Sequence, residues 1–300
     1  GIETERPIEI VNWTNEEGSR FAPAMISSGV FAGAFTVDWA YARADRDGHT
    51  MGDELARIGY QGETPVGGRD IHAFFELHIE QGPILEAEEK TIGVVTDCQG
   101  QRWYELTLTG FEAHAGPTPM DRRRDALLGA ARVIELVNRI GLERAPSACA
   151  TVGQIDVHPN SRNVIPGEVF LTIDFRHPDN DVLEDMCRAL EQGVAEIAEA
   201  IGLERQLEQI FSFRPVQFDA TCVAALREGA EAYDYSHRDI LSGAGHDAVY
   251  IAAIAPTAMV FVPCVDGVSH NETEECKPEW VTAGANVLLH AVLEMAGRVD

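Results

Sequence analysis

The chain has 300 residues, 45% of them hydrophobic, and a net charge of −26 at pH 7. At roughly 100–200 residues per domain this is one large domain or two ordinary ones, with enough apolar residues to exclude a mainly disordered chain. The acidic balance argues against nucleic acid and membrane surfaces as partners, because phosphate groups are bound by basic patches. No run of the sequence approaches the ~20 apolar residues that a membrane helix needs.

The six cysteines are widely spaced and contain no Cys-x-x-Cys pair. This spacing fits neither a zinc ribbon nor a disulfide scaffold. It favours a reducing, cytoplasmic location.

Hydrophobic periodicity predicts twelve elements along the chain. In chain order they are a strand at 7–13, a helix at 37–58, strands at 74–79 and 103–110, a helix at 125–140, strands at 150–157 and 168–176, a helix at 182–201, a strand at 207–213, a helix at 223–233, a strand at 257–262 and a helix at 278–293. Loops rich in Gly, Pro and polar residues follow the strands at 7–13, 74–79 and 257–262.

The middle of the chain differs in pattern from its two ends. Its order of strand, helix, two strands, helix and strand predicts a compact α+β sandwich of one sheet and two helices. The two ends combine strands with helices and predict an α/β layer. We therefore predict one α/β domain at 1–96 and 215–300, and an inserted domain at 97–214.

Three polar positions of the α/β domain lie at or after the ends of predicted strands. Glu16 and Glu17 come directly after the first strand, His78 lies in the apolar stretch FFELHIEQGP, and His270 lies in the loop DGVSHNETE. Carboxylate and imidazole groups suit Zn²⁺ and other divalent first-row metals. Taken singly, each position also fits a plainer interpretation: a solvated acidic turn, a core histidine and an exposed loop histidine.

The inserted domain carries a second set of candidates. His114 follows a strand in the small-residue loop GFEAHAGP, where another group can approach closely. Asn163 lies in NSRNVIPG, and Arg176 ends the strand at 168–176. The Arg176 guanidinium can grip a carboxylate through two parallel hydrogen bonds, although a surface ion pair is the plainer interpretation.

Seven motifs, taken in order, closely resemble the amidase, hydantoinase/carbamoylase family. This family includes N-carbamoyl-L-amino-acid hydrolases, β-ureidopropionases and allantoate amidohydrolases. The resemblance covers essentially the whole chain and outweighs the plainer interpretations. The motifs are WTNEEGSRFAPAM, FFELHIEQGP, LTGFEAHAGPTPMDRRRDAL, NVIPGEV, DFRH, GAGHDA and GVSHNETE.

The resemblance implies an α/β, di-metal aminopeptidase-like catalytic domain at 1–96 and 215–300. It also implies an inserted α+β lid at 97–214 that forms a homodimer. The implied activity is metal-dependent hydrolysis of a linear amide other than a peptide bond. N-carbamoyl-L-amino acids or 3-ureidopropionate would be split into amino acid, carbon dioxide and ammonia.

The resemblance also implies a role for each matching position. Glu16 resembles the general base, and His114 resembles a catalytic residue that reaches the partner subunit's site. The matching metal ligands are Glu17, His78 and His270. The matching substrate-binding residues are Gln81, Asn163, Arg176, Gly245 and His246.

These residue types suit the implied chemistry. Two divalent ions, Zn²⁺ or alternatively Mn²⁺, Co²⁺ or Ni²⁺, would lower the pKa of a shared water toward neutrality. Glu16 would take up a proton and pass it to the leaving amine, while His114 would help to stabilise the oxyanion. Arg176 and Asn163 would hold the substrate carboxylate in a locally positive pocket.

The sequence departs from the family pattern before Glu16. The family has two further metal ligands there, a histidine and a bridging aspartate, and none of the fifteen residues before Glu16 is a histidine. We therefore expect that about a quarter of the family's length is missing on the N-terminal side. We also expect that this chain alone holds no metal or one weakly bound metal and is nearly inactive.

Two alternatives remain open at this point. Within the same fold the activity could be that of an allantoate amidohydrolase, or of a related aminoacylase or peptidase. From another class, the chain could be a non-catalytic dimerising fragment that binds small carboxylates. A general base such as Glu16 favours catalysis, because a binding module needs none.

Overall fold

The computed structural model describes residues 1–299 and divides the chain into two compact units. We call Gly1–Cys98 together with the chain from Val216 onward the flank unit, and Gln99–Pro215 the insert unit. The predicted boundaries at 97 and 214 lie within two residues of this division.

The elements along the chain are as follows. The strands are β1 (Glu3–Thr4), β2 (Phe74–Ile79), β3 (Ile92–Cys98), β4 (Gly100–Thr109), β5 (Ala113–His114), β6 (Cys149–His158), β7 (Val164–Ile165), β8 (Glu168–His177), β9 (Glu204–Phe213), β10 (Val216–Gln217), β11 (His237–Ser242), β12 (Thr257–Val262) and β13 (Arg298–Val299). The α-helices are α1 (Ile26–Phe31), α2 (Val37–Tyr41), α3 (Met51–Arg57), α4 (Ile84–Ala87), α5 (Ala126–Leu142), α6 (Asn180–Ile201), α7 (Ala220–Ala232), α8 (Asp247–Ile251) and α9 (Pro278–Ala296).

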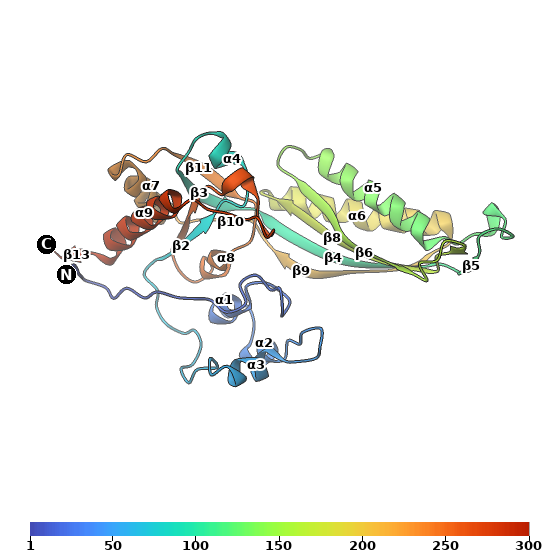
Figure 1. Cartoon of the computed structure of the whole chain (residues 1–300), viewed down its shortest axis with the longest axis horizontal. Coiled ribbons are helices and arrows are strands. Elements are labelled where there is room, and N and C mark those ends of the chain that lie inside the picture. Colours follow the sequence, from blue (N-terminus) through green and yellow to red (C-terminus); the bar gives the residue numbers. More distant parts are fainter. Residues whose placement is uncertain (300) are drawn as a thin grey trace. The chain divides into compact units, whose positions relative to one another are not determined.

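The flank unit is built on a five-stranded sheet. In this sheet β12 lies between β2 and β3, and both β10 and β11 pair with β3. All six residues of β12 are buried, and α7 and α9 pack against the sheet while α8 contacts β2 and β12 (Figure 1). Because β2 and β12 run parallel, the loops that follow them leave from the same edge of the sheet.

The insert unit is an antiparallel sheet covered by two helices. The strand order is β6-β8-β4-β9, and α5 and α6 pack on one face (Figure 1). Alternate residues of β4 and β8, among them Leu106, Leu108, Leu171 and Ile173, are buried beneath these helices. The opposite face carries the alternate residues, among them Trp103, Glu105, Asp174 and Arg176, since successive side chains of a strand point to opposite faces.

The helix beginnings in this structure follow from side-chain capping. Asp125, Asp179 and Asp219 precede α5, α6 and α7, and each carboxylate accepts hydrogen bonds from two backbone N–H groups of the first turn. A cap of this kind satisfies donors that have no partner within the helix.

Two predicted elements are wrong. Residues 7–13 form no strand: the backbone of Glu5 and Arg6 bonds to the end of α9, and the chain then runs exposed, with Ile10 98% accessible. Alternation alone does not make a strand without a neighbouring strand to pair with. The single helix predicted at 37–58 is two helices, α2 and α3, because the Asp45 side chain accepts the backbone N–H groups of residues 47 and 49 and closes a turn between them.

Candidate active site

The paired carboxylates lie on a braced turn of the flank unit. Asn15 adopts a left-handed backbone conformation with φ of 63°, and its side-chain amide donates to the carbonyl oxygens of Phe21 and Pro23. The N–H of Met25 donates to the Glu16 carbonyl at 2.8 Å. These bonds fix the backbone at Glu16 without a preceding strand.

Glu16 and Glu17 lie beside the two predicted histidine ligands. Burial raises the pKa of Glu16, and the charge of Glu17 raises it further, whereas His78 and His270 act to lower it. Glu17 Oε2 lies 3.1 Å from His270 Nε2. The structure therefore brings the adjacent pair Glu16 and Glu17 close to two histidines that are far away in the sequence.

The local bonds of His78 set its ring tautomer. Its Nδ1 lies 2.9 Å from the carbonyl oxygen of Ile79. A carbonyl oxygen can only accept, so in the neutral ring Nδ1 carries the hydrogen and Nε2 presents a lone pair. This is the usual arrangement behind a metal-binding histidine.

His270 is held by the backbone of its loop. It adopts a φ of 56°, and its N–H donates to Glu274 Oε2 at 3.0 Å. Ser269 donates to the same oxygen at 2.8 Å. The His270 side chain is 69% exposed and points toward Glu17.

One carboxylate and two imidazoles are a donor set that fits a divalent first-row metal. Glu17, His78 and His270 are the residues that could hold one. Within residues 1–299, no group of three His, Cys, Asp or Glu side chains is already arranged as metal ligands.

Gln81 presents a buried acceptor near this group. Its Nε2 donates to Ser269 Oγ at 3.2 Å, and the Ser269 hydroxyl donates onward to Glu274. Within the described chain its Oε1 is buried without a hydrogen-bond partner. The Gln81 amide is therefore oriented with an acceptor available for a ligand N–H.

His246 packs against His78 with ring centroids 4.6 Å apart. Ser242 gives its hydroxyl hydrogen to the carbonyl of Ala244, so its oxygen accepts from His246 Nε2 at 3.0 Å. Gly245 precedes His246 in the loop between β11 and α8. This part of the predicted site therefore adjoins a predicted ligand.

In the insert unit, His114 and Asn163 lie side by side. The short strands β5 and β7 pair, and the N–H of Ala115 donates to the Asn163 carbonyl at 2.9 Å. His114 Nδ1 accepts the N–H of Gly116 at 3.1 Å, so the neutral ring carries its hydrogen on Nε2. His114 can therefore donate a hydrogen bond through Nε2.

Arg176 lies at the other end of the insert unit. Glu168 pairs with Thr109 at one end of the β4–β8 ladder, and Arg176 pairs with Gln101 at the other. Eight residues of strand at ~3.3 Å each separate these ends by ~26 Å. Since β5 lies beyond the Glu168 end (Figure 1), one copy of the insert unit does not bring Arg176 and His114 together.

The family of the chain follows from its sequence. Residues 1–294 match the sequence profile of peptidase family M20/M25/M40. The chain belongs to this family. M20-family amidohydrolases generally use divalent metal ions, which agrees with the metal dependence predicted from the sequence.

Its relatives include named amidohydrolases. The chain is 54% identical to an N-carbamoyl-L-amino-acid amidohydrolase of Rhizobium meliloti, over 100% of the chain and 72% of the relative. It is 35% identical to an allantoate amidohydrolase of Escherichia coli (strain K12), over 97% and 71%. A crystal structure of an amidase of the hydantoinase/carbamoylase family from Burkholderia vietnamiensis matches with a TM-score of 0.90 and 69% identity, over 95% and 69%. These likenesses confirm the predicted fold class and family.

Sequence reasoning missed a partly buried acidic group beside the candidate site. Glu76 lies two residues before His78 on β2, and its Oε2 accepts the N–H of Ala248 at 2.8 Å. Burial, with the charge of Asp247, raises the pKa of Glu76 to about 8. A glutamate inside the apolar stretch FFELHI was the available signal, since an acidic residue is almost never buried without a partner.

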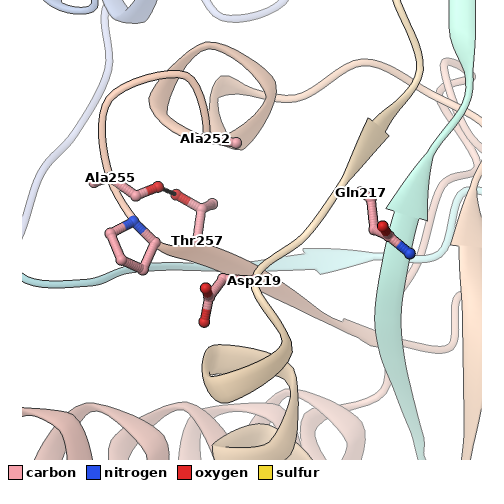
Figure 2. Close-up of a pocket in the computed structure, with 6 residues that line it drawn as sticks. Gln217, Asp219, Ala252, Ala255 and Thr257 are labelled. Carbon is pink, nitrogen blue, oxygen red and sulfur yellow. Dashed lines mark hydrogen bonds between the residues drawn. The ribbon is translucent and has the colours of Figure 1, made fainter.

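A cavity of about 260 Å³ lies elsewhere in the flank unit (Figure 2). It contains none of the predicted site residues. The Asp219 carboxylate in its wall caps α7, and the Thr257 hydroxyl donates to the Ala255 carbonyl. The remaining lining residues are Gln217, Ala252 and Pro256.

Among the described residues, no helix is both long enough and apolar enough to cross a membrane.

Proposed function

We propose that this M20-family chain serves the metal-dependent hydrolysis of the carbamoyl C–N bond of N-carbamoyl-L-amino acids or 3-ureidopropionate. The products are an amino acid, carbon dioxide and ammonia. The observation that carries the proposal is the grouping of Glu16 with Glu17, His78 and His270. The likeness to a named N-carbamoyl-L-amino-acid amidohydrolase supports this substrate class.

Glu17, His78 and His270 are the proposed metal ligands. A bound Zn²⁺, or alternatively Mn²⁺, Co²⁺ or Ni²⁺, supplies a water of lowered pKa and a positive charge beside the substrate carbonyl. His78 is prepared for this role by its Nδ1–H bond to the Ile79 carbonyl. With these three side chains we propose no metal or one weakly bound metal in this chain, against two where all five ligands of the family pattern are present.

Glu16 is the proposed general base. Its carboxylate is partly buried, and the resulting rise in pKa brings it closer to the operating pH of the reaction. Glu16 would hold the proton taken from water and release it to the leaving nitrogen. Its neighbour Glu17 keeps a different task, because its Oε2 faces His270.

Gln81, Gly245 and His246 are proposed to line the pocket for the ureido group. The buried Gln81 Oε1 is an acceptor, and a ureido group presents N–H donors. The hydrogen bond to Ser269 holds the Gln81 amide in this orientation.

The separation within the insert unit supports a site shared between two copies. We propose that Arg176 of one chain and His114 with Asn163 of another serve the same substrate, Arg176 and Asn163 holding its carboxylate and His114 donating through Nε2 to the oxyanion. The ~26 Å of strand between the two ends prevents one copy from supplying both.

The proposed homodimer forms through the insert unit. Its strand β6 is a ten-residue edge strand with mostly exposed residues, a ready template for pairing with a second copy. The neighbouring helix α5 supports this dimer interface, because its side chains Leu127, Leu128, Ile134 and Leu142 are apolar and exposed.

We also propose a cytoplasmic location, which the sparse, widely spaced cysteines support.

The test is an assay of a metal-loaded form that carries all five ligands of the family pattern, with N-carbamoyl-L-leucine, 3-ureidopropionate and allantoate, measuring ammonia release. E16Q should abolish turnover while zinc binding persists, and E63Q, at an exposed position, should change neither. Unaltered turnover in E16Q would refute the role of base. The highest kcat/KM with allantoate would favour that alternative, and ligand binding without turnover in any metal-loaded form would favour the binding fragment.

The same assay tests whether the 300-residue chain is nearly inactive by itself. We propose that it is, because it offers three candidate ligands where the family pattern has five. Ready turnover by the purified chain would contradict this.

A further inference from the structure

Arg176 forms a hydrogen-bonded ion pair with a carboxylate on its own strand. Asp174 precedes it by two residues on β8, so both side chains project from the same face of the sheet. Arg176 Nη2 donates to Asp174 Oδ2 at 2.7 Å, and Arg176 Nε donates to Oδ2 at 3.0 Å and to Oδ1 at 3.3 Å. About a quarter of each side chain remains exposed.

A residue of the neighbouring strand β4 also donates hydrogen bonds to the carboxylate of Asp174. Gln101 on β4 lies directly opposite Arg176, and its Nε2 donates to both Asp174 oxygens, at 3.3 and 3.2 Å. Asp174 thus receives hydrogen bonds from two neighbouring strands. On the other side of Gln101 lies Phe213 of β9, and Trp103 lies opposite Asp174 itself.

This geometry restricts the guanidinium of Arg176. The group is planar, and its N–H donors have fixed directions. When the Nε and Nη2 donors engage one carboxylate, both the position and the plane of the group are determined. A long side chain at a strand end otherwise loses much rotamer freedom when a ligand binds, which weakens binding.

We propose that Asp174, supported by Gln101, is a positioning residue that orients the Arg176 guanidinium for the substrate carboxylate. This inference rests on the proposed function, in which Arg176 binds that carboxylate. It assigns Asp174 no contact with the reacting atoms.

The alternative, that Asp174 only neutralises the charge of Arg176, predicts the opposite change in ligand affinity when Asp174 is replaced. If Asp174 only reduced the local positive charge, its removal would strengthen the attraction of Arg176 for an anionic ligand. If Asp174 positions Arg176, its removal weakens binding although the local charge becomes more positive. The sign of the change in affinity therefore separates the two interpretations.

The first measurement follows the Arg176 Nε–H signal by NMR in the full chain labelled with ¹⁵N-arginine, with R176K identifying the signal. In D174N, hydrogen exchange at this Nε–H should accelerate about tenfold or more, because its acceptor loses its charge. D174E should restore part of the protection. E105Q removes one negative charge from the same face of β4 and should leave the exchange rate unchanged.

The second measurement titrates N-carbamoyl-L-leucine and follows the same signal. We expect D174N to raise the Kd about tenfold, Q101A to raise it less, and E105Q to leave it unchanged or lower it. An unchanged or lower Kd in D174N, or an unchanged exchange rate, would overturn the positioning role. A wild-type Arg176 signal that does not respond to the ligand would instead refute the proposed function of Arg176, whatever D174N does to exchange.

Discussion

Ser28 and Asp247 lie 219 residues apart in the sequence and share a hydrogen bond in the interior of the flank unit, with the Ser28 hydroxyl donating to Asp247 Oδ1. Both residues are almost fully buried. Burial raises the pKa of Asp247 to about 7; the Ser28 bond acts to lower it, and the charge of Glu16 raises it. This contact links α1 to α8 next to the proposed site.

The first prediction concerns Asp247 and pH. Its pKa is raised from 3.8 to about 7 on folding, so its contribution to stability is present below pH 3.8 and is lost as the pH rises toward 7. At ~1.4 kcal/mol per pKa unit the loss is up to about 4 kcal/mol. We expect D247N to match the wild type near pH 4 and to exceed its free energy of unfolding at pH 8. Denaturant unfolding at both pH values checks this, and parallel stability profiles would contradict it.

The second prediction concerns Glu54 on α3. Arg57 and then Arg20 lower the pKa of Glu54 from 4.5 to about 2 by hydrogen bonds and charge. The stabilisation is therefore present above pH 4.5 and is lost as the pH falls toward 2. E54Q should be less stable than the wild type at pH 7, and the difference should vanish near pH 2. Thermal unfolding across this range is the measurement, with E63Q as the control that should follow the wild type throughout.

The third prediction concerns metal binding. After loading with zinc and removal of the excess, elemental analysis should find no zinc or one weakly held ion per chain. E17Q should weaken any bound zinc at least tenfold, because His78 and His270 alone leave the site one ligand short. D70N, at an exposed position, should bind zinc as the wild type does. Two tightly held ions per chain would overturn the proposed stoichiometry.

The fourth prediction uses mixed dimers. H114A and R176A should each be inactive alone, because every site of either homodimer lacks one group. When equal amounts are mixed and allowed to exchange subunits, half of the dimers contain one intact site, and about a quarter of wild-type turnover should return. The experiment uses the form with all five ligands of the family pattern, whose unsubstituted dimer is the reference. Absence of recovery despite demonstrated subunit exchange would refute the shared site.

Sequence periodicity predicts the insert unit well because its elements are regular and locally determined. Strand alternation at 103–110 and 168–176 places β4 and β8, and the apolar spacing at 125–140 and 182–201 places α5 and α6 to within three residues at each end. The same alternation misleads at 7–13, where Ile10 is almost fully exposed and no strand pairs with the segment. A strand depends on a partner that a local pattern does not contain.

The candidate site could be predicted only in part, for a similar reason. Family motifs gave Glu17, His78 and His270. The structure places His270 beside Glu17 and both histidines close enough to act on the charge of Glu16, but within residues 1–299 it does not arrange the three as metal ligands. The contact between Asp247 and Ser28 joins distant segments and leaves no local signature. The position of Arg176 relative to His114 depends on which strands pair and at which end of the β4–β8 ladder β5 lies, and these contacts join segments distant in the sequence.

The length of the β4–β8 ladder has a consequence for how the protein can evolve. In the proposed dimer, the ten-residue pairing of β4 with β8 sets the distance between the residues that one chain contributes to two different shared sites. An insertion of two residues in both strands would keep every side chain on its original face, yet would displace Arg176 from His114 by a further ~7 Å. Insertions are therefore expected in the loops around this ladder and not within it, even where no residue of the ladder touches substrate.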